Sequence, residues 1–187
     1  MNKKRILFIT FVTLLVTLAC TIFVGGPEIP QPPIPVSAEA VTQLQDQITN
    51  AVAAGAVSGE VTLQINEVQL TSFLAYKFLE DETPLLTEPQ VYLRDGQMRI
   101  FGKTQQGSFA ANIGIVLAVG LDENSEPALQ IISADFGPLP LPDGLNKAIT
   151  AVIEEAYTGA LGPVATGFRI TSITIADGVM TIVGRIR

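Results

Sequence analysis

Acidic side chains are the main residues of this sequence whose type could support chemistry, and the candidates among them fall into three settings. Two carboxylates with separated pKa values can work as an acid and a base, and a cluster of carboxylates can bind a cation. The sequence contains no histidine, so the commonest general base and the commonest transition-metal ligand are both missing. The acidic settings are the runs Glu80 to Glu82 and Asp122 to Glu126, the Asp-Gly pairs that begin at Asp95 and Asp177, and the single Asp135.

Each acidic setting also has a structural explanation. The run from Asp122 to Glu126 lacks the alternating ligands and central glycine of a calcium loop, so a solvated turn and a weak cation site are its two interpretations. Asp95 and Asp177 suit a tight turn better than catalysis. Asp135 could be a half-buried acid, but no second carboxylate or histidine accompanies it. We therefore predict no catalytic residue, no metal and no cofactor, and expect that the protein is not an enzyme.

The first 24 residues predict an N-terminal membrane anchor. Three charges in MNKKR precede 19 uncharged residues, about the roughly 20 that a spanning helix needs, and the basic flank favours export of the remainder. Ala19 before Cys20 also fits a lipoprotein signal, so an uncleaved anchor, a lipidated Cys20 and a cleaved secreted form are the alternatives. All three predict a domain on the extracytoplasmic side, and the first two hold it at the cell membrane.

Beyond residue 24 the sequence is acidic and begins with a proline-rich stretch. Eight bases stand there against all 18 acids, which argues against a nucleic-acid partner. Five prolines between Pro27 and Pro35 predict an extended linker. The expected organisation is an anchor over residues 1–24, a linker over 25–40 and one domain over 41–187.

Periodicity predicts the elements of that domain. Apolar residues at helical spacing predict helices near 37–54, over 67–79 and over 145–161. Alternation predicts strands over 60–65, 107–121 and 128–136, and Asp-Gly turns predict hairpins over 91–102 and 173–184.

The two hairpins are related in sequence. VYLRDGQMRIFG, from Val91, and ITIADGVMTIVG, from Ile173, share Asp-Gly, Met, Ile and Gly at the same places. Each also follows a strand and a helix, so the chain contains two strand-helix-hairpin pseudo-repeats. We expect an α+β fold in which a long curved antiparallel sheet wraps around two or three helices.

The domain resembles a group of envelope proteins. The likeness is carried by VTLQINEVQLTSFLA, VYLRDGQMRIFG, ADFGPLPLPDGL and ITSITIADGVMTIVG, within residues 59–184. These resemble the YpmS-like membrane-anchored proteins and the actinobacterial (LmeA-like) family that includes a phospholipid-binding lipoprotein. The resemblance implies a fold similar to tubular lipid-binding domains and a lipid or other hydrophobic ligand, and it carries over no catalytic residue.

The leading functional hypothesis is a membrane-anchored protein that binds a lipid-like ligand in an apolar groove between helices and sheet. The alternative is a protein-interaction or assembly module of the envelope that uses an exposed sheet edge or the polar faces of the hairpins, with partners unknown. The candidate groove lining consists of Leu70, Phe73, Leu74, Ile113, Ile115, Leu117, Phe136, Ile149, Val152 and Ile153.

Overall fold

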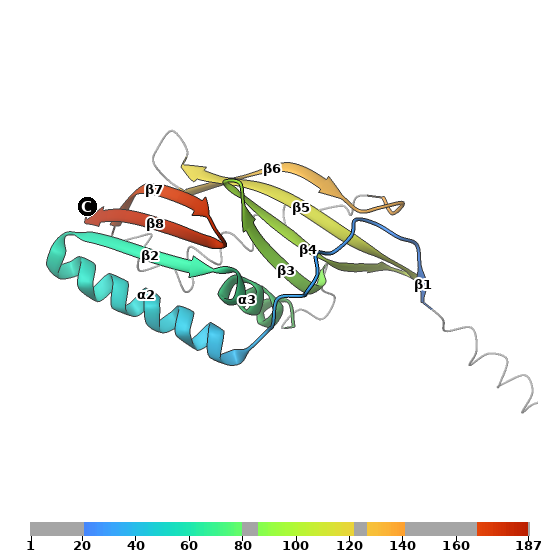
Figure 1. The fold of residues 1–187 in the computed structure, drawn as a ribbon, viewed down its shortest axis with the longest axis horizontal. Helices are drawn as coiled ribbons and strands as arrows, with labels where there is room; N and C mark the ends of the chain where they lie inside the picture. The colour runs from blue at the N-terminus through green and yellow to red at the C-terminus, as the bar shows by residue number, and fades with distance from the viewer. Residues whose placement is uncertain (1–20, 80–85, 122–126, 141–167, 187) are drawn as a thin grey trace, which may run out of the picture.

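Eight strands and two helices make up the described part of the protein, a computed structural model that describes residues 21–79, 86–121, 127–140 and 168–186. The strands form a strongly curled surface, and both helices pack against it (Figure 1). The predicted α+β class with a curved sheet is therefore confirmed. In chain order the elements are β1 (Ile22–Phe23), α2 (Ala38–Ser58), β2 (Glu60–Asn66), α3 (Glu67–Leu79), β3 (Thr87–Arg94), β4 (Gln97–Gln106), β5 (Phe109–Leu121), β6 (Pro127–Asp135), β7 (Phe168–Ala176) and β8 (Val179–Ile186).

The larger sheet has five strands. Strands β3, β4 and β5 pair antiparallel in that order. The other side of β5 pairs near its start with the short parallel β1, and further along the strand with the antiparallel β6. The smaller sheet has the order β2, β8, β7 and is antiparallel throughout. One end of the molecule is thus the three-stranded sheet with α2, and the other end is the five-stranded sheet (Figure 1).

The pseudo-repeats exchange their single strands between these sheets. Strand β2 belongs to the first repeat but pairs with β8 of the second, over residues Glu60 to Asn66. Strand β6 belongs to the second repeat but lies in the sheet of the first hairpin. The units recognised in the sequence therefore do not fold side by side as separate halves. Each one contributes a strand to the sheet that contains the other's hairpin.

Both Asp-Gly turns have the backbone that the sequence predicts. Asp95 and Gly96 have φ of 55° and 75°, and Asp177 and Gly178 have φ of 50° and 79°. Positive φ at both central positions defines the type I′ turn of a two-residue hairpin. The register across the first turn pairs Leu93 with Met98, so the apolar positions of β3 and β4 share one face.

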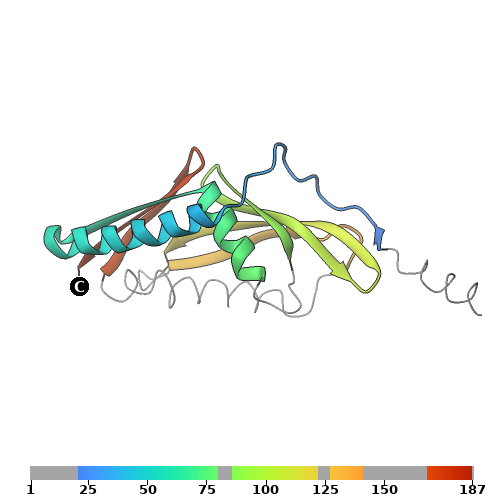
Figure 2. The same ribbon diagram turned by 90° about the horizontal axis from the view of Figure 1, so that it is seen from below.

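Helix α2 packs along β2, and α3 lies between α2 and β3 (Figure 2). Ser37 caps α2 by accepting a hydrogen bond from the Ala40 backbone N–H at 3.0 Å. The helix continues past the expected end near Gly55, and Gly59 closes it with a left-handed φ of 80°. Asn66 caps α3 through a reciprocal pair of hydrogen bonds with Gln69. The third expected helix, over 145–161, lies outside the described residues.

The expected linker is bound to the sheet rather than extended away from it. We call residues 24–37 the N-terminal strap. Asn112 donates from Nδ2 to the Pro27 carbonyl, and the Tyr92 hydroxyl donates to the Pro30 carbonyl at 3.0 Å. Further along, the Gln90 side chain hydrogen-bonds both backbone groups of Ile34. The strap therefore crosses from β5 to β3 before α2 begins.

The expected membrane anchor and the membrane location that rests on it are corrected. The expected spanning segment includes Thr21 to Val24. In the structure, Ile22 and Phe23 form β1, and the Ile22 N–H donates to the Ser108 carbonyl. Within the ranges that the structure describes, no helix is long and apolar enough to cross a bilayer. Cys20, the expected lipidation site, lies outside those ranges. The physical reason for the correction is that the last apolar residues of the stretch pair with a strand of the domain.

Candidate functional site

The candidate site is the inner face of the five-stranded sheet. Alternation along β5 places every second residue from Ala111 to Leu121 on this face, and all of them are apolar. The strand registers place apolar neighbours beside them, such as Ile100 beside Ile115 and Ile131 beside Leu117. The inner face across β3, β4, β5 and β6 therefore has a wide apolar surface with no charged side chain. Its members on the neighbouring strands are Val91, Leu93, Met98, Ile100, Leu129, Ile131 and Ala134.

Seven of the ten predicted lining residues are described. Five of them are buried in the apolar core, and Ile113 has no exposed surface. Leu70 and Phe73 of α3 are partly buried against the same core. Ile149, Val152 and Ile153 lie outside the described residues. The structure thus places the described lining residues in one apolar cluster, and the buried ones are Leu74, Ile113, Ile115, Leu117 and Phe136.

Burial decreases along the inner face. Leu117 near the middle of β5 is buried, whereas Val119 and Leu121 at its end are only partly buried. Ile131 of β6 and Ile173 of β7 are partly buried as well, and β7 contacts β5. We call Val119, Leu121, Ile131 and Ile173 the apolar rim. None of these four residues is among the predicted lining, although Val119 and Leu121 follow the same alternation as Ile113.

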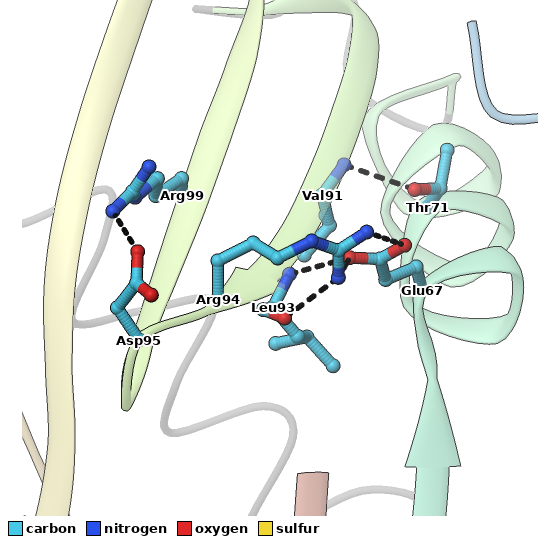
Figure 3. Close-up of polar contacts among 7 residues, drawn as sticks. All are labelled: Glu67, Thr71, Val91, Leu93, Arg94, Asp95 and Arg99. Atoms are coloured by element: carbon cyan, nitrogen blue, oxygen red, sulfur yellow. Dashed lines mark hydrogen bonds and ion pairs between the residues drawn. The ribbon is translucent and has the colours of Figure 1, made fainter. Parts of the chain in front are cut away.

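Polar side chains of α3 bind the outer edge of β3 (Figure 3). The Val91 backbone N–H donates to Thr71 Oγ1 at 2.9 Å, and the Leu93 N–H donates to Glu67 Oε1 at 2.7 Å. Glu67 and Thr71 are four residues apart, so they lie on the same side of the helix. Together they supply acceptors to two successive outward N–H groups of the strand. The apolar stripe of α3 gives no sign of this contact, because Glu67 and Thr71 lie outside that stripe.

The two hairpin turns meet at Glu67. Its carboxylate also pairs with the Arg94 guanidinium, and Nη2 of Arg94 lies 3.2 Å from Oε2. The Glu67 backbone N–H donates to the Gly178 carbonyl, and the Gly178 N–H donates to the Leu93 carbonyl, both at 3.2 Å. Glu67 is 16% exposed and Arg94 is 46% exposed, so solvent screens the pair in part. This cluster joins the β7–β8 turn to the end of β3.

Acidic residues that could do chemistry have structural partners here. Asp95 forms an ion pair with Arg99 at 2.8 Å (Figure 3), and Asp135 Oδ1 accepts the Gly137 N–H at 2.8 Å. The acidic runs at 80–82 and 122–126 lie outside the described residues. Within the described ranges no group of three or more potential ligands could hold a metal ion. Asp95 and Asp135 therefore have structural contacts in the described part of the chain.

The environment of Tyr92 shifts the pKa of its phenol. Partial burial raises the pKa of its phenol above the ordinary value, the negative charge of Glu67 raises it further, and Arg94 opposes both. Its ring also packs edge-on against Phe101, with centroids 5.8 Å apart. The neutral hydroxyl is the form that donates to the strap at Pro30. Tyr92 thus belongs to the attachment of the strap.

Comparisons of the chain with protein-family models, with curated proteins and with solved structures find no match. The resemblance to the YpmS-like and actinobacterial lipoprotein families stays a prediction. The fold and the candidate site define the class of protein: an α+β domain with a curled sheet, an apolar inner face and one edge bound by helix side chains.

Proposed function

We propose that this protein binds a hydrophobic ligand, such as a lipid with an acyl chain, against the inner face of β5 and β6. The observation that carries the proposal is the apolar rim, which continues the buried apolar face of β5 to partly exposed residues without an intervening charge. Ligand sites are mostly apolar with few polar groups, so such a surface has the appropriate chemistry.

The rim also indicates which part of the predicted lining would contact a ligand. Ile113 and Leu117 are filled core positions, since their surfaces are already covered. Leu121 and Ile131 retain exposed apolar surface, and covering it would be favourable by about 25 cal/mol per Å². An acyl chain would contribute about 0.8 kcal/mol for each methylene that becomes buried, before the cost of ordering it.

The test measures uptake of two probes by the full chain. The probes are palmitic acid with a fluorescent group, and phosphatidylcholine vesicles containing a fluorescent phospholipid. We expect fluorescence to rise on binding and native mass spectrometry to detect a protein-lipid complex. Leu121→Gln should weaken uptake about tenfold, because the amide would lose its hydration beside the chain.

Val57→Gln is the matched control, since Val57 lies on α2 and is 91% exposed. It should bind both probes as the parent chain does, and thermal unfolding should verify that both variants are folded. Absence of uptake by the parent chain, or equal uptake by Leu121→Gln, would contradict the proposal.

A further inference from the structure

Strand β6 forms one margin of the five-stranded sheet (Figure 1). Among the residues that the structure describes, β5 is its only pairing partner. Its second side therefore carries backbone N–H and C=O groups that can pair with an added strand. The opposite margin, β3, differs because Thr71 and Glu67 accept its outward N–H groups.

The charge pattern around β6 selects the kind of strand that fits. From Pro127 to Ala134 the strand has no charged residue, and Asp135 ends it. In the sequence, Asp122, Glu123 and Glu126 precede the strand, and no Lys or Arg occurs over residues 122–146. An added strand with an apolar centre and basic ends would match this pattern.

A β-bulge limits the length of regular pairing. Leu117 pairs with Ile131 and Val116 with Ser133, so Ile132 is the extra residue. The regular part before the bulge runs from Pro127 to Ile131. The Ile132 side chain is 51% exposed, which leaves an apolar anchor beside the edge. The bulge also restricts unlimited edge-to-edge association, so a short segment fits better than a long strand.

We infer that the outer edge of β6 binds a short, extended segment of a partner protein that has an apolar centre and basic ends. Backbone hydrogen bonds supply affinity in this mode, and the exposed Ile132 supplies an apolar contact. The net charge of −7 for the whole chain attracts a basic segment over a longer range.

A second copy of this chain fits the edge less well. In a two-fold dimer, two β6 strands would pair antiparallel, so the last residue of one strand would lie near the start of the other. Asp135 of one copy would then approach the start of β6 in the second copy, which Glu126 precedes in the sequence. Like charges opposed across a strand pair are destabilising. A partner with basic ends would not meet this repulsion, because its lysines or arginines would face the acidic ends of β6.

The test uses the full chain and a labelled synthetic peptide in which valine and threonine alternate, with paired lysines at each end. We expect fluorescence anisotropy to detect binding that weakens as salt is added. Hydrogen exchange should show new protection in peptides covering residues 127–135. Ile132→Lys should weaken binding about tenfold, which corresponds to about 1.4 kcal/mol, and Gln130→Lys, at another exposed position of β6, should weaken it in the same direction.

Two controls separate strand pairing from simple charge attraction. Val57→Lys makes the same charge change at an exposed apolar residue of α2 and should leave binding within about twofold. A peptide N-methylated at alternate residues retains its lysines but loses the donors for pairing, so it should not bind. Absence of binding at low salt, unchanged binding by both β6 variants, or protection outside residues 127–135 would overturn the inference. So would a dimer of the chain in light scattering with β6 protected in the absence of peptide.

Discussion

The two margins of the five-stranded sheet are built from different residue types. At β3, a threonine and a glutamate of α3 accept backbone N–H groups, and Gly102 of β4 allows Leu86 and Thr87 to approach closely. At β6, the strand is uncharged, a bulge exposes Ile132, and Gly120 of the neighbouring β5 has no atom near the position of a Cβ. The β3 margin is therefore tightly packed, whereas the region around β6 tolerates added atoms.

The elements packed next to each margin therefore decide whether its backbone groups can pair with another strand. Helix α3 immediately precedes the strand region that it covers, and its polar residues lie on the side that faces β3. No described helix makes a comparable contact with β6. Ligand binding at the apolar rim and peptide binding at β6 are both proposed for the part of the sheet near β6, away from the β3 margin.

A methyl group added at each margin should separate them most strongly. In Gly102→Ala the new Cβ would lie 2.7 Å from the Thr87 carbonyl oxygen and 2.4 Å from a Leu86 methyl carbon, so the backbone must shift. We expect a loss of about 3 kcal/mol in the free energy of unfolding, measured by urea denaturation. Gly120→Ala should be neutral or stabilising by about 0.5 kcal/mol. Equal losses at both glycines would remove the contrast.

Loss of one acceptor at the β3 margin should have an intermediate effect. Thr71→Val keeps the side-chain shape but leaves the buried Val91 N–H without its acceptor, at a cost of about 1.5 kcal/mol. Thr42→Val is the control, because Thr42 is an exposed residue of α2 whose hydroxyl bonds its own helix, and it should change stability by less than about 0.5 kcal/mol. Urea denaturation and hydrogen exchange at Val91 would measure both effects. A loss in Thr42→Val as large as in Thr71→Val would contradict this account.

The smallest expected effect concerns Tyr92 and the strap. Because burial and Glu67 raise its pKa, folding favours the neutral phenol. The resulting stabilisation is fully present below the ordinary pKa of about 10 and is lost as pH rises through the raised value. Tyr92→Phe should therefore lose stability less steeply than the parent chain above pH 10. In an absorbance titration, the tyrosinate component that Tyr92→Phe removes should titrate at a higher pH than an ordinary tyrosine. Removal of a component with the ordinary pKa would refute the assignment.

The sequence by itself determined the local elements. Alternation, helical spacing and Asp-Gly turns placed β5, α3 and both hairpins, because these patterns report which face of an element is apolar and where φ is positive. The apolar character of the inner face was also readable, since the β5 lining residues follow from period two. The capping of α3 by Asn66 is likewise local, because the Asn66 side chain accepts a hydrogen bond from the Gln69 N–H three residues later.

Only the tertiary structure decided how those elements combine. The exchange of β2 and β6 between sheets depends on long-range pairing, which local periodicity does not encode. The same holds for the strap and for β1. A proline-rich sequence predicts a linker, but the Pro27 carbonyl accepts a hydrogen bond from Asn112. An apolar run predicts an anchor, but the Ile22 N–H at its end donates to the Ser108 carbonyl. The roles of Thr71 and Glu67, and of the β6 edge that no other described strand pairs with, became apparent only once the strands were ordered, because an edge is a property of the assembled sheet.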